Sequence, residues 1–303
     1  MSDPRRLLIA VDVDGTLVDT EMAQELRAPE IAAVRRVREA GHVLALCTGR
    51  SARSVESVVR AADGALAGAP MILLNGALVL ADGGARVLRD GGLPRETAAA
   101  VVGMFLAAGA LPLAFDMESD GGGLRAQRLE PNPVLGRYLE RRLERVGEIA
   151  LSDDLAADLP HTVQEVGTIE REPVVRELAA AIRARFGEEV WVVTTETLID
   201  RDSYRWLEVM PPHCHKGSGL ELLAAHLEIP RERVVAIGDN YNDLDMFLAA
   251  GHSVAMGNAP ADVRAVAGRV APSVSEHGAA VVLDEIARGA WPLNPGGSGG
   301  PLA

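Results

Sequence analysis

The stretch Leu7–Asp19, LLIAVDVDGTLVD, runs from an apolar segment into two carboxylates, and the fold of the chain is decided there. Residues 7–11 are all apolar, which is typical of a strand covered on both faces in a parallel sheet. Gly15 allows a sharp turn after the strand. Because aspartate is a poor strand residue, Asp12 and Asp14 indicate either a solvated turn or a nucleophile, acid and metal cluster. An EF-hand is disfavoured, since its glycine is the sixth residue of a loop that follows a helix.

The bulk composition favours a two-domain protein of the cytoplasm. With 303 residues the chain is long for one hydrophobic core. A formal net charge of −13 disfavours nucleic acid and anionic membranes as partners, but it permits a small phosphorylated substrate held by a local cation. No apolar run has transmembrane length, and the N-terminal MSDPRR resembles no signal peptide. Two cysteines, Cys47 and Cys214, are too few for a disulfide framework.

Apolar runs alternate with helical patterns in the first 77 residues, and each run ends in polar residues. Val43–Cys47 leads to Thr48-Gly49-Arg50, and Met71–Leu74 leads to Asn75-Gly76. A last run of this kind, Val234–Ile237, leads to GDNYND at 238–243. In an open α/β sheet, ligands bind outside the carboxyl ends of the strands, so these polar ends should converge with Asp12 and Asp14. The fold class predicted is α/β: a Rossmann-like, doubly wound parallel sheet.

From about Leu78 the pattern changes to strands paired by turns and interrupted by helices. The segments 78–80 and 86–88 flank Asp82-Gly83-Gly84, which indicates a hairpin at the start of an α+β insert. We expect a discontinuous core domain of residues 1–80 and 211–290, and an inserted α+β domain of residues 81–210. The Gly/Pro-rich residues 291–303 predict a flexible tail.

Within the insert, Arg137, Arg141 and Arg145 share one face of a predicted helix, near two glutamates at pairing distance. A salt-bridged, solvated face is the expected interpretation, and a cationic lid for an anionic substrate is the alternative.

Four carboxylates at strand ends, Asp12, Asp14, Asp239 and Asp243, would repel one another unless their pKa values rise or a divalent cation neutralises them. A set of oxygen ligands favours Mg²⁺, which also accepts a phosphate oxygen. An aspartate beside the ion can attack phosphorus, and a second carboxylate can protonate the departing alcohol. Thr48 and Lys216 offer a hydroxyl and a charge for the phosphoryl oxygens.

These residues resemble the four motifs of the haloacid dehalogenase (HAD) superfamily: Asp12-Val13-Asp14-Gly15-Thr16, Thr48-Gly49-Arg50, Lys216 and Gly238-Asp239-Asn240-Tyr241-Asn242-Asp243. Asn75-Gly76-Ala77, Gly257-Asn258-Ala259 and the insert resemble its Cof-type branch with a class IIB cap. The resemblance covers the whole chain except the tail.

The resemblance implies a role for each matching residue. Asp12 would be the nucleophile and a metal ligand, Asp14 the acid/base with its main-chain carbonyl on the metal, and Asp239 the third protein ligand. Thr48 and Lys216 would hold the phosphoryl group. Asp243 would orient Lys216 or metal-bound water and belongs to the candidate metal set. Gly49, Arg50, Asn75 and Asn242 complete the candidate phosphate site.

The chain departs from the family just before Lys216, where Pro212, His213 and His215 replace a lysine, a glycine and a serine. Because His213 and His215 flank Cys214, a soft-metal site is conceivable, although ordinary loop residues are the expected interpretation. The departure leaves substrate preference and hinge geometry open.

The sequence predicts a Mg²⁺-dependent phosphatase that acts on a small phosphomonoester, and a sugar phosphate is the favoured substrate. Dehalogenases of the superfamily lack an acid at the position of Asp14, so this residue points to phosphoryl transfer. A phosphomutase on the same scaffold is the alternative, and a non-catalytic phosphate-binding regulator is a third.

Overall fold

The computed structural model describes residues 6–20, 26–116, 123–197 and 203–290. Two compact units form: one contains residues 1–49, 58–88 and 215–303, and the other contains residues 50–57 and 89–214. The predicted tail, residues 291–303, lies outside the described residues. Among the described helices, none has the length and apolar character needed to cross a membrane.

The first unit is built on an eight-stranded sheet in the order β16-β15-β14-β1-β2-β3-β4-β5. Neighbouring strands from β16 to β3 are parallel, whereas β4 runs antiparallel to β3. The strands are β1 (Leu8–Val11), β2 (Val43–Cys47), β3 (Met71–Leu73), β4 (Leu78–Ala81), β5 (Arg86–Asp90), β14 (Val234–Gly238), β15 (His252–Ala255) and β16 (Arg269–Val270). The predicted α/β class is confirmed.

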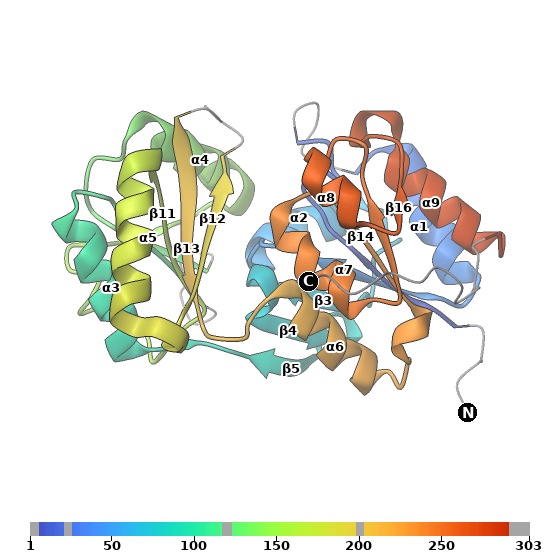
Figure 1. Ribbon diagram of the computed structural model, residues 1–303, viewed down its shortest axis with the longest axis horizontal. Helices are drawn as coiled ribbons and strands as arrows, with labels where there is room; N and C mark the ends of the chain where they lie inside the picture. Colours follow the sequence, from blue (N-terminus) through green and yellow to red (C-terminus); the bar gives the residue numbers. More distant parts are fainter. Residues whose placement is uncertain (1–5, 21–25, 117–122, 198–202, 291–303) are drawn as a thin grey trace. The chain divides into compact units, whose positions relative to one another are not determined.

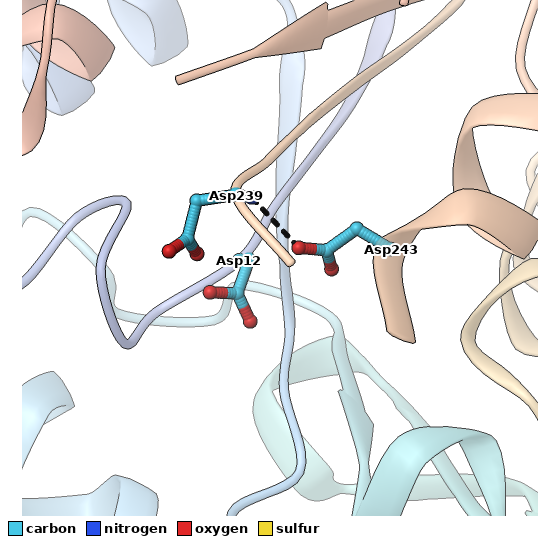
Figure 2. Close-up of side chains that lie close together, drawn as sticks. All are labelled: Asp12, Asp239 and Asp243. Atoms are coloured by element: carbon cyan, nitrogen blue, oxygen red, sulfur yellow. Dashed lines mark hydrogen bonds between the residues drawn. The ribbon is translucent and has the colours of Figure 1, made fainter. Parts of the chain in front are cut away.

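Asp12 follows β1 and Asp239 follows the neighbouring β14, and Figure 2 shows that their side chains lie close together. The backbone N–H of Asp12 still donates to the carbonyl of Ile237, at 2.9 Å, so the ladder continues to the point where the carboxylates begin. The polar strand ends of the sequence therefore lie at one edge of the sheet.

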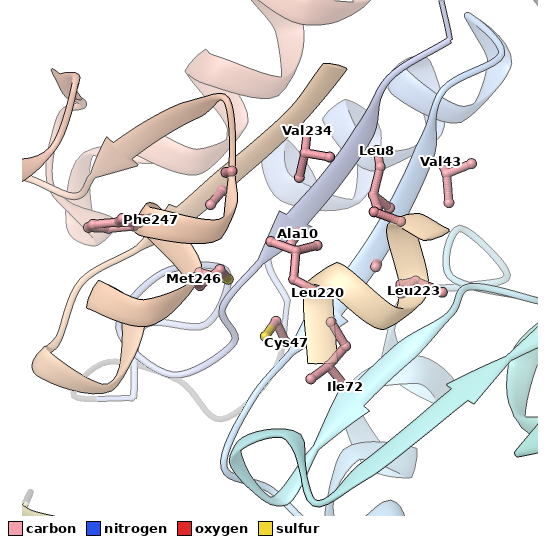
Figure 3. Close-up of a cluster of buried hydrophobic side chains, with 14 of the residues drawn as sticks. Leu8, Ala10, Val43, Cys47, Ile72, Leu220, Leu223, Val234, Met246 and Phe247 are labelled. Atoms are coloured by element: carbon pink, nitrogen blue, oxygen red, sulfur yellow. The ribbon is translucent and has the colours of Figure 1, made fainter. Parts of the chain in front are cut away.

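Helices cover this sheet on both faces. They are α1 (Ala28–Glu39), α2 (Ala52–Ala61, of which residues 58–61 belong to this unit), α6 (Lys216–His226), α7 (Leu244–Ala249), α8 (Ala261–Val266) and α9 (Gly278–Ala287). Helices α1 and α9 pack against each other, and α6 packs against α7 (Figure 1). Figure 3 shows the core in which Leu220 and Leu223 of α6 meet Leu8 and Ala10 of β1. All four residues of β1 are buried, as a strand covered on both faces requires.

The hairpin at 78–88 corrects the expected domain boundary. It was predicted to open the inserted domain, but β4 and β5 extend the core sheet as its antiparallel edge. The second segment of the first unit accordingly runs to Leu88, and its third segment begins at His215. Hairpin pairing is local and says nothing about which sheet the hairpin joins, so the sequence pattern could not place it.

The second unit contains a six-stranded sheet in the order β12-β13-β11-β7-β8-β9 and a two-stranded pair of β10 with β6. Its neighbouring strands are antiparallel, except that β8 and β9 are parallel. The strands are β6 (Leu93–Pro94), β7 (Leu113–Phe115), β8 (Leu124–Gln127), β9 (Ala150–Ser152), β10 (Thr162–Val163), β11 (Glu165–Arg171), β12 (Trp191–Glu196) and β13 (Tyr204–Met210). The strands β6 and β9 were not predicted; they are only two and three residues long.

Three helices complete the second unit: α3 (Arg95–Ala107), α4 (Pro133–Val146) and α5 (Glu172–Phe186). Apolar residues of α3 and α5 form one core with Val166 of β11 and Leu207 of β13. The alternate strand residues Glu165 and Glu208 point to the opposite face of the sheet, yet they too are buried. This mixture of paired strands and helices is the α+β domain that the sequence predicted.

Candidate active site

Lys216 lies at the centre of the carboxyl edge of the first unit. It is the only lysine in the chain, although 30 residues are lysine or arginine. It begins α6, and its side chain is 1% exposed. Its Nζ donates to Asp12 Oδ1 at 2.7 Å and to Asp243 Oδ1 at 2.6 Å. Burial alone would lower the pKa of Lys216, but these two carboxylates raise it well above its usual range, so the ammonium stays charged.

Asp243 is held as firmly as Lys216. Its Oδ2 accepts hydrogen bonds from the backbone N–H groups of Asp239, at 2.8 Å, and Asn240, at 3.0 Å (Figure 2 draws the bond from Asp239). A Cβ on Gly238 would lie 2.4 Å from the Asp243 carboxyl carbon, so any side chain at position 238 would collide with Asp243. With both oxygens engaged, Asp243 orients Lys216 and shapes the turn after β14.

One carboxylate oxygen from each of Asp12, Asp239 and Asp243 lies within 4.8 Å of the others, which makes this trio a candidate cation site. Burial raises the pKa of Asp12 from 3.8 to about 7, opposed by Lys216 and reinforced by Asp243 and Asp14. Burial, followed by repulsion from Asp12, raises the pKa of Asp239 well above its usual range. A divalent cation would relieve this repulsion, and an all-oxygen donor set suits Mg²⁺. The residues present therefore fit the predicted metal.

Gly15 allows the acidic side chains to approach so closely. Its φ is +84°, and a Cβ there would lie 2.3 Å from Asp239 Oδ2. Asp14 lies next to it, outside the trio of side chains, and forms a backbone bridge with Val18. The acid/base role of the Asp14 carboxyl stays a prediction from the sequence.

The candidate phosphate residues gather beyond β2 and β3. The backbone N–H of Asn75 donates to the carbonyl of Thr48 at 3.2 Å, and Asn242 Nδ2 donates to Asn75 Oδ1 at 3.0 Å. A Cβ on Gly49 would lie 3.3 Å from the Asn75 amide. Four predicted phosphate contacts are thus brought together. Arg50 starts the segment 50–57, which groups with the second unit.

His215, the residue before Lys216, has a structural role. His215 caps α6, with its Nδ1 accepting from the N–H of Ser218 at 3.2 Å. Within the described ranges, the acidic trio is the only group of metal-ligating side chains that converges, and it includes neither His213 nor Cys214. The soft-metal alternative is therefore not supported.

In α4, the arginines of the predicted face are solvated where they are described. Arg137 and Arg141 are exposed, and the Arg145 side chain lies outside the described part. The sequence did not single out Arg142, which is 2% exposed and lies over the Phe115 ring at 5.5 Å. It donates to Ser51 Oγ at 3.2 Å in the same unit.

Two further side chains contact Asp239 and were not predicted. Thr16 Oγ1 donates to Asp239 Oδ1 at 3.1 Å, and Asn258 Nδ2 donates to Asp239 Oδ2 at 3.1 Å. Asn258 follows β15, the next strand beyond β14. Polar residues after parallel strands were expected to converge, and the same expectation applied to β15 would have predicted that Asn258 lies at the site.

Comparison with known proteins places the chain in a family. A family model described as haloacid dehalogenase-like hydrolase matches residues 9–283, so the chain belongs to that family. A 5-amino-6-(5-phospho-D-ribitylamino)uracil phosphatase of Bacillus subtilis is 25% identical over 285 residues, 92% of this chain and 96% of that protein. A putative phosphatase of Haemophilus influenzae is 34% identical over 146 residues, 48% of this chain and 51% of that protein. The latter match thus spans about half of that relative.

A solved structure described as a HAD subclass IIB sugar phosphatase has the same fold. Its TM-score is 0.75 at 20% identity, with 92% of this chain and 98% of that chain covered. The predicted superfamily, branch and enzyme class, a phosphatase of the HAD type, are thereby confirmed.

Proposed function

We propose that the chain is a Mg²⁺-dependent phosphomonoester hydrolase of the cytoplasm that acts on a small phosphorylated metabolite through a phosphoaspartate at Asp12. The observation that carries the proposal is the buried contact of Lys216 with Asp12 beside the carboxylate of Asp239. A sugar phosphate is the substrate class we favour, because the subclass IIB relative of the same fold is a sugar phosphatase. The location rests on Cys47 and Cys214, which are both free and buried, as suits a reducing compartment.

In the first half-reaction, a carboxylate oxygen of Asp12 forms a bond to phosphorus while the bond to the departing alkoxide breaks. Asp14 donates its proton to the oxygen of the departing alkoxide, so the product leaves as a neutral alcohol. Lys216 and Thr48 hold the phosphoryl oxygens, and Asn242 extends this set of donors. Lys216 also keeps Asp12 oriented, because its Nζ bonds to Oδ1 at 2.7 Å.

In the second half-reaction, Asp14 takes a proton from water, whose oxygen attacks phosphorus. The bond between phosphorus and the Asp12 oxygen breaks, so inorganic phosphate leaves and Asp12 returns as a carboxylate. Asp12 and Asp239 would hold Mg²⁺, with the carbonyl of Asp14. When bound, the ion neutralises the acidic cluster and polarises the phosphoryl group. Because burial raises the pKa of Asp12 to about 7, the carboxyl would be only partly ionised near neutral pH without the ion, and the ion would favour its ionised form.

Hydrolysis of an aryl phosphate by Asp12→Asn tests the proposal. We expect a loss of at least about 10³-fold in kcat, because an amide is a poor nucleophile. The matched control is Asp63→Asn, which alters an exposed aspartate that pairs with Arg35. Full activity in Asp12→Asn would contradict the mechanism.

The substrate requires a separate experiment, in which a panel of phosphorylated metabolites is assayed with and without Mg²⁺. Release of free phosphate that depends on Mg²⁺, strongest for a sugar phosphate, is the expected result. An isomerised sugar phosphate without phosphate release would instead identify a mutase. No turnover of any compound would favour the regulator.

A further inference from the structure

Asn258 is an exposed residue whose side chain makes three hydrogen bonds, two of them toward the acidic site. Its Nδ2 donates to Asp239 Oδ2 at 3.1 Å and to the carbonyl of Gly15 at 3.0 Å. Its Oδ1 accepts from the backbone N–H of Val274 at 2.8 Å. A backbone N–H can only donate, so the atom facing Val274 must be the amide oxygen, and the atom facing Asp239 must be the nitrogen.

This amide fixes Asp239 together with Thr16. Thr16 Oγ1 donates to Oδ1 of Asp239, while Asn258 donates to Oδ2, so each carboxylate oxygen accepts one hydrogen bond from the protein. A carboxylate oxygen has two lone pairs, and each oxygen therefore keeps one for a cation. The same amide also donates to the carbonyl of Gly15. Gly15 lies directly against the Asp239 carboxylate, so Asn258 contacts both the segment after β1 and the segment after β14.

Val274, which anchors the Asn258 side chain, is itself held by further contacts. The carbonyl of Val274 accepts a hydrogen bond from the guanidinium of Arg27, which also pairs with Glu30 at 3.1 Å. Glu30 is fully buried, and its Oε1 also contacts His277 at 2.8 Å. Val274, whose N–H orients Asn258, is thus held at its own carbonyl by Arg27, which pairs with Glu30 of α1, and Glu30 in turn contacts His277 of the turn before α9.

From these contacts we infer that Asn258 is a positioning residue for cation binding, which acts by orienting Asp239. The inference rests on the proposed function, because it concerns the Mg²⁺ that Asp239 would hold. Loss of a residue that orients a metal ligand typically weakens metal affinity by about 10- to 100-fold. We expect a change of this size when the Asn258 donor is removed, without a comparable change in the stability of the metal-free protein.

The experiment is calorimetric titration of Mg²⁺, and of Mn²⁺ as a second probe, into the metal-free full chain. The variants are Asn258→Ala and Asn258→Ser, so that a folded variant is retained if the alanine is poorly folded. The control is Tyr241→Phe, which removes the hydroxyl of a half-exposed tyrosine and its hydrogen bond to Asp262 and keeps both side-chain donors to Asp239. Urea unfolding of each metal-free variant separates affinity from stability.

We expect Kd for both ions to rise by about 10- to 100-fold in the Asn258 variants and to stay within about twofold in the control. Unchanged Kd in folded Asn258 variants would overturn the role of Asn258 alone. If the unsubstituted chain binds neither ion, the proposed metal dependence is overturned, and the role of Asn258 with it. A loss of metal-free stability with unchanged Kd would show a purely structural residue and would also overturn the inference.

Discussion

Replacing Lys216 by methionine removes the charge at the centre of the site while keeping a long, unbranched side chain. In the native site, Nζ lies 2.7 Å from Asp12 Oδ1 and 2.6 Å from Asp243 Oδ1, and the side chain is 1% exposed. The substitution leaves two buried carboxylates without their shared cation. Breaking a buried ion pair by removing one partner costs about 3–5 kcal/mol. We expect the free energy of unfolding of the metal-free protein to fall by this amount.

The size of this loss should depend on pH. Burial already raises the pKa of Asp12 to about 7, against the opposing effect of Lys216. Without Lys216 the pKa of Asp12 rises further, so at pH 5 the carboxyl is protonated and the uncompensated charge is smaller. A raised pKa in the folded state means that stability is lost as the pH rises through that pKa. The methionine variant should therefore be weakened less at pH 5 than at pH 8.

Activity should fall as well, because Lys216 is a charged donor to the phosphoryl oxygens in the proposed reaction. Removing one such donor costs about 10²- to 10³-fold in kcat. Lys216→Arg keeps the charge but brings a larger, planar group into a filled slot, at a cost of about 1–3 kcal/mol. We expect the arginine variant to be more stable than the methionine variant and less active than the native enzyme.

Urea unfolding in EDTA at both pH values measures the stability, and aryl phosphate hydrolysis with Mg²⁺ measures kcat. The reasoning fails if the methionine variant unfolds within about 0.5 kcal/mol of the native chain at pH 8 and keeps its kcat. Equal destabilisation at pH 5 and pH 8 would contradict the part of the argument that concerns Asp12.

Two carboxyl groups and one glycine give further tests. As the pH rises from about 4 to about 8 and Asp12 ionises, urea unfolding of the metal-free protein should show a loss of up to about 4 kcal/mol of unfolding free energy. Mg²⁺ should raise the unfolding free energy more at pH 8 than at pH 4. Burial raises the pKa of Glu165 well above its usual range, so Glu165→Gln should lose less stability than the native chain as pH rises from 5 to 9 in the same assay. Gly15→Ala places a Cβ 2.3 Å from Asp239 Oδ2, so calorimetry should find Mg²⁺ affinity reduced at least about tenfold.

Local patterns in the sequence were sufficient to predict the strands that carry the site. Apolar runs identify β1, β2 and β14, and the rule that ligands bind at carboxyl strand ends brings Asp12 and Asp239 together before any contact is known. The specific contacts could not be predicted in this way. The hydrogen bond of Asn258 to Gly15 joins residues 243 positions apart, and no local pattern encodes such a pairing.

The errors share a physical cause, which is that a local pattern does not determine its tertiary partner. The hairpin of β4 and β5 was correctly expected as a hairpin, yet it joins the core sheet rather than the insert. Arg142 lies beside three arginines that suggest a solvated face, but its own face of α4 packs over Phe115. Burial of a charge is decided by what covers it, and that is set by the fold.

The central claim is that Asp12 carries the phosphoryl group, and chemical trapping tests it most directly. The full chain is mixed with a substrate found in the metabolite panel, quenched in acid during turnover, and treated with borohydride, which reduces an acyl phosphate to an alcohol. Tandem mass spectrometry should then find homoserine at position 12 in the native chain and unmodified asparagine in Asp12→Asn. Homoserine at another aspartate, or rapid turnover with Asp12 never modified, would contradict the account.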